Sequence, residues 1–372
     1  MARNRPSLTT DDGFMRPPPH RRCGVLLSII AASAFGVGCA TTSARPHPRA
    51  LALQAAGVEA LGRGELESAA GHFALALEYD PHLAEAESGL GLVALRRGDL
   101  ARAEEDFRTA LALNEDLAEA HVNLADLLMR RDDVESALAE ARAALAIDPG
   151  YADARLLAGE LLMRLGRMSD AHWELEKLCA AYPRRADAHA ANALVLARLG
   201  RPAAAGEQAD LALAIDPDLP AGHRARAEIL RRTGELEEAT REIELAIAAN
   251  PGSVEDRLAR ATILAARGLW GESARALGDL VAAAPRQPEV RFVMAFVALN
   301  RGQAEAAVQD ADDALALRTH YPEARLIRAE ALLRLARAEE ARRELARFLD
   351  EAPTTMVAER AQAAQTLAAV PR

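Results

Sequence analysis

Aromatic side chains are scarce in this chain of 372 residues. Phe, Trp and Tyr together make up 3% of the sequence, although 50% of the residues are hydrophobic. A core of this composition must consist mainly of Ala, Leu and other small side chains, which lets backbones pack close together. The length would allow two or three domains.

Paired cysteines and an excess of positive charge are also missing. The three cysteines, Cys23, Cys39 and Cys179, have no spacing typical of a metal site or a redox pair, which excludes a disulfide framework. The first 38 residues carry five Arg and two Asp, a net +3, so the formal charge of −10 becomes −13 without them. Nonspecific nucleic-acid binding needs an excess of Lys and Arg, and the sequence therefore argues against a nucleic-acid partner.

The N-terminal region has no apolar run long enough to span a bilayer. The uncharged run 25–38 has fourteen residues, whereas a spanning helix needs about 20. Basic residues precede this run and small residues follow it, an order typical of a secretory signal. We therefore predict a signal peptide over 1–39. A flexible tether over 40–49 follows, because that stretch is polar and proline-containing without apolar periodicity.

The end of this segment resembles the lipobox of bacterial lipoproteins, in which a small residue precedes a cysteine that is lipidated and becomes N-terminal. Val37 and Gly38 before Cys39 fit the pattern, whereas Gly36 stands where the family prefers Leu. The resemblance implies export and attachment to a membrane through a lipid on Cys39. Ala40, in place of Asp, favours the outer membrane, with the protein facing the periplasm. Ordinary cleavage with a soluble product, an uncleaved anchor and a cytoplasmic protein remain the alternatives.

A period of 34 residues runs without insertion from Ala50 to Thr355, which makes nine repeats. The eighth place is always Gly or Ala, and the twentieth is Ala in every repeat except the seventh, which has Ser273. Seven repeats have Gly in the middle, and seven have Pro at the thirty-second place. Asp132 and Ala336 replace the middle Gly, and Glu115 and Thr319 replace the Pro.

This pattern predicts two helices in each repeat. Each repeat has two apolar-periodic stretches of about 13 residues, which is long enough for helices. The Gly between them can adopt the left-handed conformation that ends the first helix, and the Pro stops the second. Small residues at fixed places let the helices approach closely. One repeat cannot bury its own apolar face, so stability is expected to come from neighbouring repeats.

The pattern resembles the tetratricopeptide repeat over 306 of the 372 residues. The resemblance implies an all-α fold, a right-handed α-solenoid of nine helix pairs over 50–355 that makes roughly one superhelical turn. The Ala-rich segment 356–372 would form a C-terminal capping helix. The family implies a non-catalytic protein–protein interaction scaffold, in which the first helix of each repeat lines a concave groove for an extended segment or helix of another protein.

The places expected to face this groove form an acidic row at place 2, a basic row at place 13 and apolar residues between them. We assign the following residues to the partner-binding groove: Leu92, Arg96, Val122, Met129, Arg130, Leu156, Met163, Arg164, Arg198, Arg232, Leu258, Phe292, Phe296 and Leu299. The charged rows have a simpler explanation as well, since acids in a first turn and Arg in a last turn complement the helix dipole.

Phe292 and Phe296 stand one helical turn apart with Leu299 close by. In this repeat, Asn300 replaces the Arg of the basic row. Two large rings on one groove surface predict a notch for an apolar anchor of the partner. The alternative is that both rings pack against neighbouring helices.

No group of residues predicts catalysis, a metal site or a cofactor. His121, His189 and His223 recur at the fourth place of their repeats, which in this family packs against the adjacent helix. Cys179 is expected to be a small buried hydrophobe, and Trp173 and Trp270 are expected in the core. We therefore predict no enzyme, no cofactor and no metal.

These features predict an outer-membrane lipoprotein that assists assembly of an envelope complex. The exported tetratricopeptide lipoproteins that the chain resembles serve type IV pilus and secretin assembly, tight-adherence secretion or gliding motility. A cytoplasmic adaptor is the alternative if the N-terminus is neither cut nor translocated. A second alternative is a recruiting subunit of an envelope enzyme whose chemistry lies on another chain.

Overall fold

The computed structural model describes residues 46–354 and 356–370. The predicted signal peptide, Cys39 and the first part of the tether lie outside the described residues. Among the helices that are described, none is both long and apolar enough to cross a membrane.

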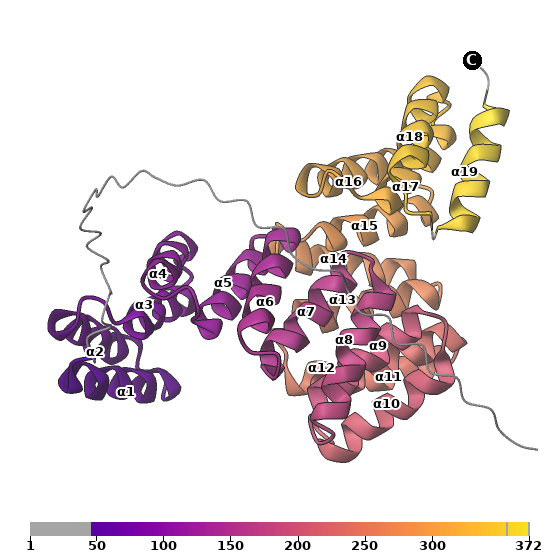
Figure 1. The fold of residues 1–372 in the computed structure, drawn as a ribbon. Helices are drawn as coiled ribbons and strands as arrows, with labels where there is room; N and C mark the ends of the chain where they lie inside the picture. Colours follow the sequence, from indigo (N-terminus) through magenta and orange to yellow (C-terminus); the bar gives the residue numbers. More distant parts are fainter. Residues whose placement is uncertain (1–45, 355, 371–372) are drawn as a thin grey trace, which may run out of the picture. The chain divides into compact units, whose positions relative to one another are not determined.

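The described residues form nineteen α-helices and no strand (Figure 1). Their bounds are α1 (Pro48–Gly62), α2 (Leu66–Tyr79), α3 (Ala84–Arg97), α4 (Leu100–Leu113), α5 (Ala118–Arg130), α6 (Val134–Ile147), α7 (Ala152–Arg164), α8 (Met168–Ala181), α9 (Ala186–Arg198), α10 (Pro202–Ile215), α11 (Pro220–Thr233), α12 (Leu236–Ala249), α13 (Val254–Ala266), α14 (Trp270–Ala283), α15 (Pro288–Asn300), α16 (Ala304–Leu317), α17 (Pro322–Arg334), α18 (Ala338–Glu351) and α19 (Val357–Ala369). The predicted all-α fold is confirmed. Helix α1 begins two residues before the predicted start of the first repeat at Ala50.

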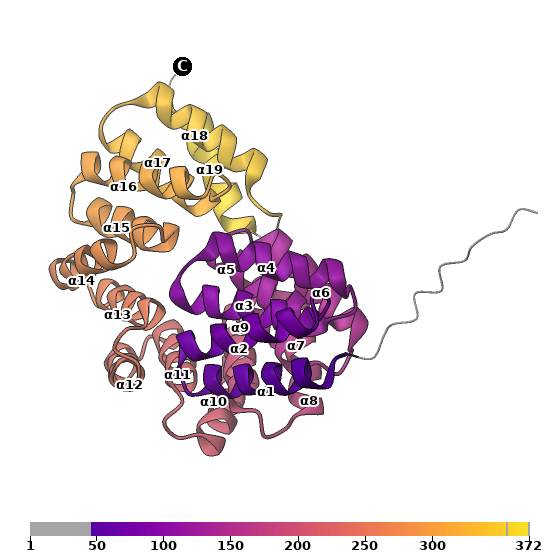
Figure 2. The same cartoon turned by 90° about the vertical axis from the view of Figure 1, so that its left-hand side faces the viewer.

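Each odd-numbered helix from α1 to α17 packs against the even-numbered helix that follows it, and the pairs succeed one another along the chain (Figure 2). Each odd-numbered helix also contacts the next odd-numbered helix, from α1 through α17. The first helices of the repeats therefore lie side by side and share one continuous surface. We call this surface the odd-helix surface, and it is the one on which the predicted groove residues stand.

The turn between the two helices of a repeat takes the predicted left-handed conformation. At Gly98, φ is 81°, and the next N–H, that of Asp99, donates to the carbonyl oxygen of Ala94 at 3.0 Å, which closes the end of α3. The other six middle glycines also have positive φ. Asp132 and Ala336 adopt the same conformation with φ of 62° and 59°, although their side chains make it less favourable.

The core follows the small residues of the repeat. Every residue at the twentieth place, from Ala69 to Ala341, is fully buried. Ser273 takes this place in the seventh repeat, and its Oγ donates a hydrogen bond of 2.7 Å to the carbonyl oxygen of Ala261 on the partner helix. The hydroxyl is thereby satisfied at a position where an unpaired polar group would be costly.

The last helix, α19, covers α18. Ala363 is buried against Leu345 and Phe348. Arg342 on α18 donates to the carbonyl oxygen of Val370 at 2.6 Å, and Arg360 on α19 donates to that of Ala352 at 2.6 Å. These contacts join the helix to the ninth repeat at both of its ends.

Candidate partner-binding groove

Three arginines of the basic row bind the neighbouring repeat. Arg96 donates from Nη1 to the carbonyl oxygen of Leu61 at 2.7 Å, and Arg334 donates likewise to Leu299 at 2.6 Å. Arg164 reaches the carbonyl oxygen of Met129 at 3.3 Å. Each acceptor lies in the last turn of the preceding odd-numbered helix, where carbonyls have no partner within their own helix. These arginines therefore stabilise the stacking of successive repeats.

Two further arginines of the row pair with acids on their own helix. Arg130 Nε lies 3.0 Å from Asp126 Oδ2, and Arg232 Nε lies 2.6 Å from Glu228 Oε1. Both are pairs spaced four residues apart on an exposed helix face, and such pairs contribute little to stability.

Arg198, at the end of α9, differs from the rest of the row. Within the described part of the chain, no hydrogen bond or ion pair joins its guanidinium to an acceptor. Burial lowers the pKa of Arg198, Glu228 opposes this shift, and Arg232, Arg231 and Arg224 add to it. Arg198 remains protonated all the same, because a guanidinium does not lose its proton in proteins.

Glu228 is the acid that acts most strongly on Arg198, and its own oxygens are already in use. Arg231 binds it through two hydrogen bonds of 2.7 and 2.9 Å, and Arg232 binds it at 2.6 Å. Two guanidinium groups thus bind one carboxylate at the end of α11, and the charges of all three groups act on Arg198 at the end of α9. This local excess of positive charge can attract a carboxylate from outside the chain.

Arginines from other places bridge the acidic row. Arg185 binds Asp153 at 2.6 Å and Asp187 at 2.9 Å, which joins the fourth and fifth repeats. Arg224 binds Glu255 at 3.2 Å in the next repeat. The acidic row is therefore partly neutralised by the chain itself.

The apolar residues assigned to the groove are mostly edges of the core. The half-buried ones are Leu92, Val122, Met129, Leu156, Met163, Leu258 and Phe292. Leu299 is 1% exposed and packs within the cluster of α15 to α18, so it is a core residue and not part of an accessible groove.

Phe292 and Phe296 each have a different aromatic neighbour. Phe292 packs with its ring centroid 5.2 Å from that of Tyr321, and Phe296 lies edge-on to Trp270 at 6.0 Å. Phe296 is still 37% exposed. The packing explanation thus describes Phe292, while Phe296 retains a surface that a partner could contact. Tyr321 and Trp270 were not expected at these rings, since only contacts between helices bring them there.

The three recurrent histidines span their own helix pairs. Nδ1 of His121, His189 and His223 lies 2.6 to 2.8 Å from a polar side chain nineteen residues later, and Nε2 lies 3.0 to 3.2 Å from a backbone carbonyl six residues earlier. Arg155 and Arg325 make the same two contacts in other repeats. The prediction that these histidines are packing residues is confirmed. In the described ranges, no three His, Cys, Asp or Glu side chains are grouped to hold a metal.

Cys179 and Trp173 are both predicted from the sequence to be buried, but only Cys179 is even partly buried in the structure. Cys179 is half-buried, and burial raises the pKa of its thiol to about 11, which keeps the thiol protonated. Trp173 was expected in the core, and this is wrong: it is 53% exposed, with Lys177 Nζ 3.1 Å from its ring centroid. Its place on α8 faces away from the neighbouring helices.

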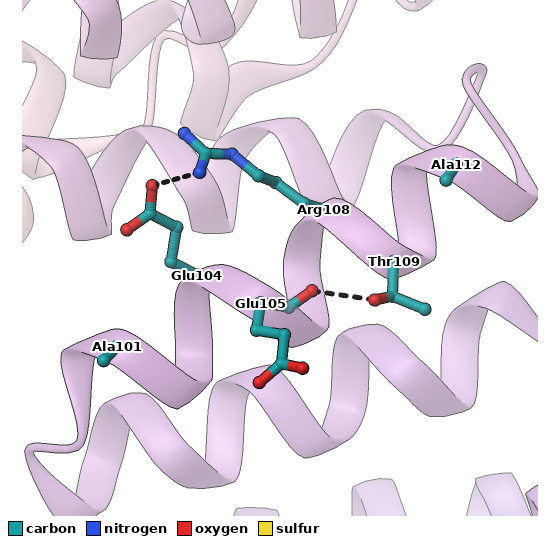
Figure 3. A pocket seen from close by; sticks show the side chains of 6 residues that line it. All are labelled: Ala101, Glu104, Glu105, Arg108, Thr109 and Ala112. Carbon is teal, nitrogen blue, oxygen red and sulfur yellow. Dashed lines mark hydrogen bonds and ion pairs between the residues drawn. The ribbon is translucent and has the colours of Figure 1, made fainter.

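A hollow of 490 Å³ runs along α4 and is lined by Ala101, Glu104, Glu105, Arg108, Thr109 and Ala112 (Figure 3). All six residues lie on one helix. Glu104 pairs with Arg108 at 2.6 Å, and the Thr109 hydroxyl donates to the carbonyl oxygen of Glu105 at 2.9 Å. Since these polar groups already bind one another, the hollow has no convergent groups that would orient a ligand.

Comparison with known proteins identifies the repeats. Two family profiles described as tetratricopeptide repeat match the sequence, one at residues 55–118 and 89–152 and the other at 131–195. No curated protein has a sequence that matches this one significantly.

Several solved structures are similar to the chain. A tetratricopeptide repeat protein from Parabacteroides merdae has a TM-score of 0.51 and 16% identity, covering 67% of this chain and 98% of that one. A chain of the APC/C hetero-tetramer Cut9–Hcn1 has a TM-score of 0.55 and 12% identity, covering 75% of this chain and 55% of that one. The Pseudomonas aeruginosa pilF protein has a TM-score of only 0.42, with 24% identity over 57% of this chain and 97% of that one. Residues 55–195 therefore belong to the tetratricopeptide repeat family, and the helix pairs that follow them continue the same α-solenoid.

Proposed function

We propose that the chain is an exported scaffold, anchored to the outer membrane by a lipid on Cys39, that holds another protein on its odd-helix surface during assembly of an envelope complex. Tetratricopeptide repeats are protein-interaction modules, and the chain carries them. One solved neighbour of this fold is itself part of a hetero-tetramer. The lipid anchor and the destination rest on the sequence before Ala50 alone.

The observation that carries the proposal for the groove is the group of charges around Arg198. The other arginines of the basic row in α3 to α11 bind a carbonyl or a carboxylate of the chain. Arg198 does not, and it stands beside Arg231 and Arg232, which share Glu228. Arg198 is exposed, so a partner segment with an Asp or Glu side chain can reach it and bind it. The half-buried Leu156 on α7 and Leu258 on α13 would contact the apolar residues of this segment.

Photo-crosslinking in intact envelope membranes tests this site. We expect a photoreactive amino acid at Leu194, one turn before Arg198, to give a discrete adduct with one partner, whereas the same probe at exposed Glu207 on α10 gives none. Arg198→Glu should reduce the adduct strongly. Arg241→Glu makes the same charge change on α12 and should leave the adduct intact. Equal adducts from both probe positions, or an adduct insensitive to Arg198→Glu, would refute the site.

Palmitate labelling tests the anchor. We expect the full chain to incorporate labelled palmitate and to fractionate with the outer membrane, and Cys39→Ser to lose both properties. Cys179→Ser is the matched control, because its thiol lies within the folded repeats. An unlabelled wild type in the soluble periplasmic fraction would support ordinary cleavage instead, and one in the cytoplasm would support an adaptor there.

Mass spectrometry of the Leu194 adduct would assign the envelope complex. The candidate complexes are those served by the lipoproteins that the chain resembles: pilus and secretin assembly, secretion and gliding motility. A component of one of these machines as the crosslinked partner would support the assignment. An envelope enzyme as the partner would instead favour the role of a recruiting subunit.

A further inference from the structure

One ion pair joins two repeats that are far apart in the sequence. Arg318, in the loop between α16 and α17, lies with Nη2 3.1 Å from Oδ1 of Asp132, in the turn between α5 and α6. The two residues are 186 positions apart. The same Nη2 lies 2.7 Å from Oε1 of Glu289, in the first turn of α15. The third repeat is thereby connected to the eighth.

Both ends of this contact depart from the repeat pattern. Asp132 replaces the middle glycine and holds a left-handed conformation that glycine adopts more readily. Thr319, next to Arg318, replaces the proline of seven other repeats. Two of the four positions at which a repeat lacks the middle Gly or the Pro therefore lie at or beside this contact.

Arg318 itself stands where five of the other repeats have Asp or Asn. Asp80, Asn114, Asp148 and Asp216 occupy the equivalent place, and each accepts a hydrogen bond from the backbone N–H two residues later. Such a bond stabilises the local turn. Arginine cannot accept a hydrogen bond, so the eighth repeat has exchanged a local turn contact for a distant one.

Other residues of the eighth repeat hold the arginine in position. Its guanidinium carbon lies 5.1 Å from the ring centroid of Tyr321, whose other ring neighbour is Phe292. The carboxylates of Glu289 and Asp132 raise the pKa of Arg318 even though burial opposes them. The side chains of Arg318, Asp132 and Glu289 are 24%, 31% and 37% exposed, so water and salt still reach the contact. An ion pair with this much exposure is weak and salt-sensitive.

We propose that the Asp132–Arg318 pair is a latch that closes the repeat array upon itself between the third and eighth repeats. The odd-numbered helices α7 to α13, with the charges around Arg198, lie in the part of the chain between the two ends of the latch. Closure therefore restricts lateral entry to the odd-helix surface, and opening admits an extended segment. This regulatory role rests on the proposed function, whereas the latch itself does not.

Distance measurement on the full chain tests the latch. Spin labels are attached through genetically encoded keto amino acids at exposed Glu135 on α6 and exposed His320 beside Arg318, which leaves the native cysteines untouched. We expect wild type at low salt to give a short, narrow distance distribution. Asp132→Asn removes the charge while keeping a side chain that tolerates the left-handed conformation, and it should shift the distribution to longer, broader distances. Wild type in 1 M salt should respond in the same direction, because the Debye length is then about 3 Å.

Ala336→Gly provides the matched control. Ala336 is the other non-glycine residue with a left-handed middle turn, and it has no charge to contribute, so this variant should keep the wild-type distribution. Asp132→Arg should open the array, and adding Arg318→Asp should close it again by reversing the pair. A distribution unchanged in Asp132→Asn, or an equal shift in Ala336→Gly, would overturn the latch. The measurement needs no partner, so failure of the latch and failure of the crosslinking at Leu194 remain distinguishable.

Discussion

The ring of Phe73 lies between Gly57 on α1 and Gly89 on α3, in the space that a side chain on either glycine would need. A Cβ atom on Gly57 would lie 2.6 Å from the Cε1 atom of the ring, and one on Gly89 would lie 2.5 Å from Cζ. Phe73 is fully buried. One aromatic side chain thus joins the two helices of the first repeat to the first helix of the second.

Gly57→Ala is expected to destabilise the protein by about 1–3 kcal/mol, because the added methyl group overpacks the ring. Gly62→Ala is the control: it lies at the end of the same helix, and a Cβ there meets nothing within 4 Å, so its effect should be small. Urea denaturation at neutral pH compares the two free energies of unfolding. A similar loss in both variants would mean that the Phe73 contact does not limit this position.

The two tryptophans are expected to respond differently to truncation. Trp270 is half-buried and packs against Phe296 and the core of α13 to α15, so Trp270→Ala should cost about 2–4 kcal/mol. Trp173→Ala should cost less than about 1 kcal/mol, because it loses mainly an exposed contact with Lys177. Since the chain has only these two tryptophans, acrylamide quenching of each single variant reports on the other. Stronger quenching of Trp270 than of Trp173 would contradict the structure.

The regular features of the fold could be predicted because the same residue pattern recurs in nine repeats. A small residue at the twentieth place, for example Ala103, meets the same neighbours in every repeat, so a fixed spacing reveals the contact. The same holds for the turn at Gly98, where the backbone conformation is set by one residue and its immediate neighbours.

Features that depend on the arrangement of several repeats could not be predicted in this way. Leu299 occupies a groove place in the sequence, yet the helices around α15 bury it. Trp173 has the size of a core residue, but its place on α8 decides its exposure. Asp132 and Arg318 meet because each repeat between them turns the array a little further. No local sequence pattern encodes that accumulated turn. The sequence shows that positions 132 and 319 depart from the repeat pattern. It does not show that these two parts of the chain lie together in the fold.

The cost of a side chain in the left-handed middle turn can be measured at Ala336. Ala336→Gly is expected to raise the free energy of unfolding by about 0.5–1 kcal/mol, because glycine adopts this conformation without a Cβ clash. Asp132→Gly should gain less or lose stability, because it also removes the carboxylate that binds Arg318. Urea denaturation of the two variants decides the point, and an equal gain in both would show that the ion pair contributes nothing.

The pH dependence of stability should include a contribution from Glu160, at the ninth place of the fourth repeat on α7. Burial raises the pKa of Glu160 to about 7, and the nearby Glu255 adds to the shift, while Arg224 and Arg164 oppose it. A raised pKa means that the folded protein holds this proton more tightly than the unfolded chain does. The favourable contribution is therefore complete below the ordinary pKa of about 4.3 and is lost as the pH rises to about 7.

Glu160→Gln cannot ionise, so it should be about 1–2 kcal/mol more stable than wild type at pH 8, a value reduced from the full shift because the side chain is partly solvated. At pH 5 the difference should fall to roughly a third of this value, because the unfolded chain is only partly protonated there. Urea denaturation at the two pH values measures this gap, and Glu255→Gln in both backgrounds should narrow it by removing the neighbouring negative charge. If the difference between the two variants is the same at pH 5 and pH 8, the pKa of Glu160 is the same in the folded protein and in the unfolded chain. The odd-helix surface around Glu160 would then be open to water.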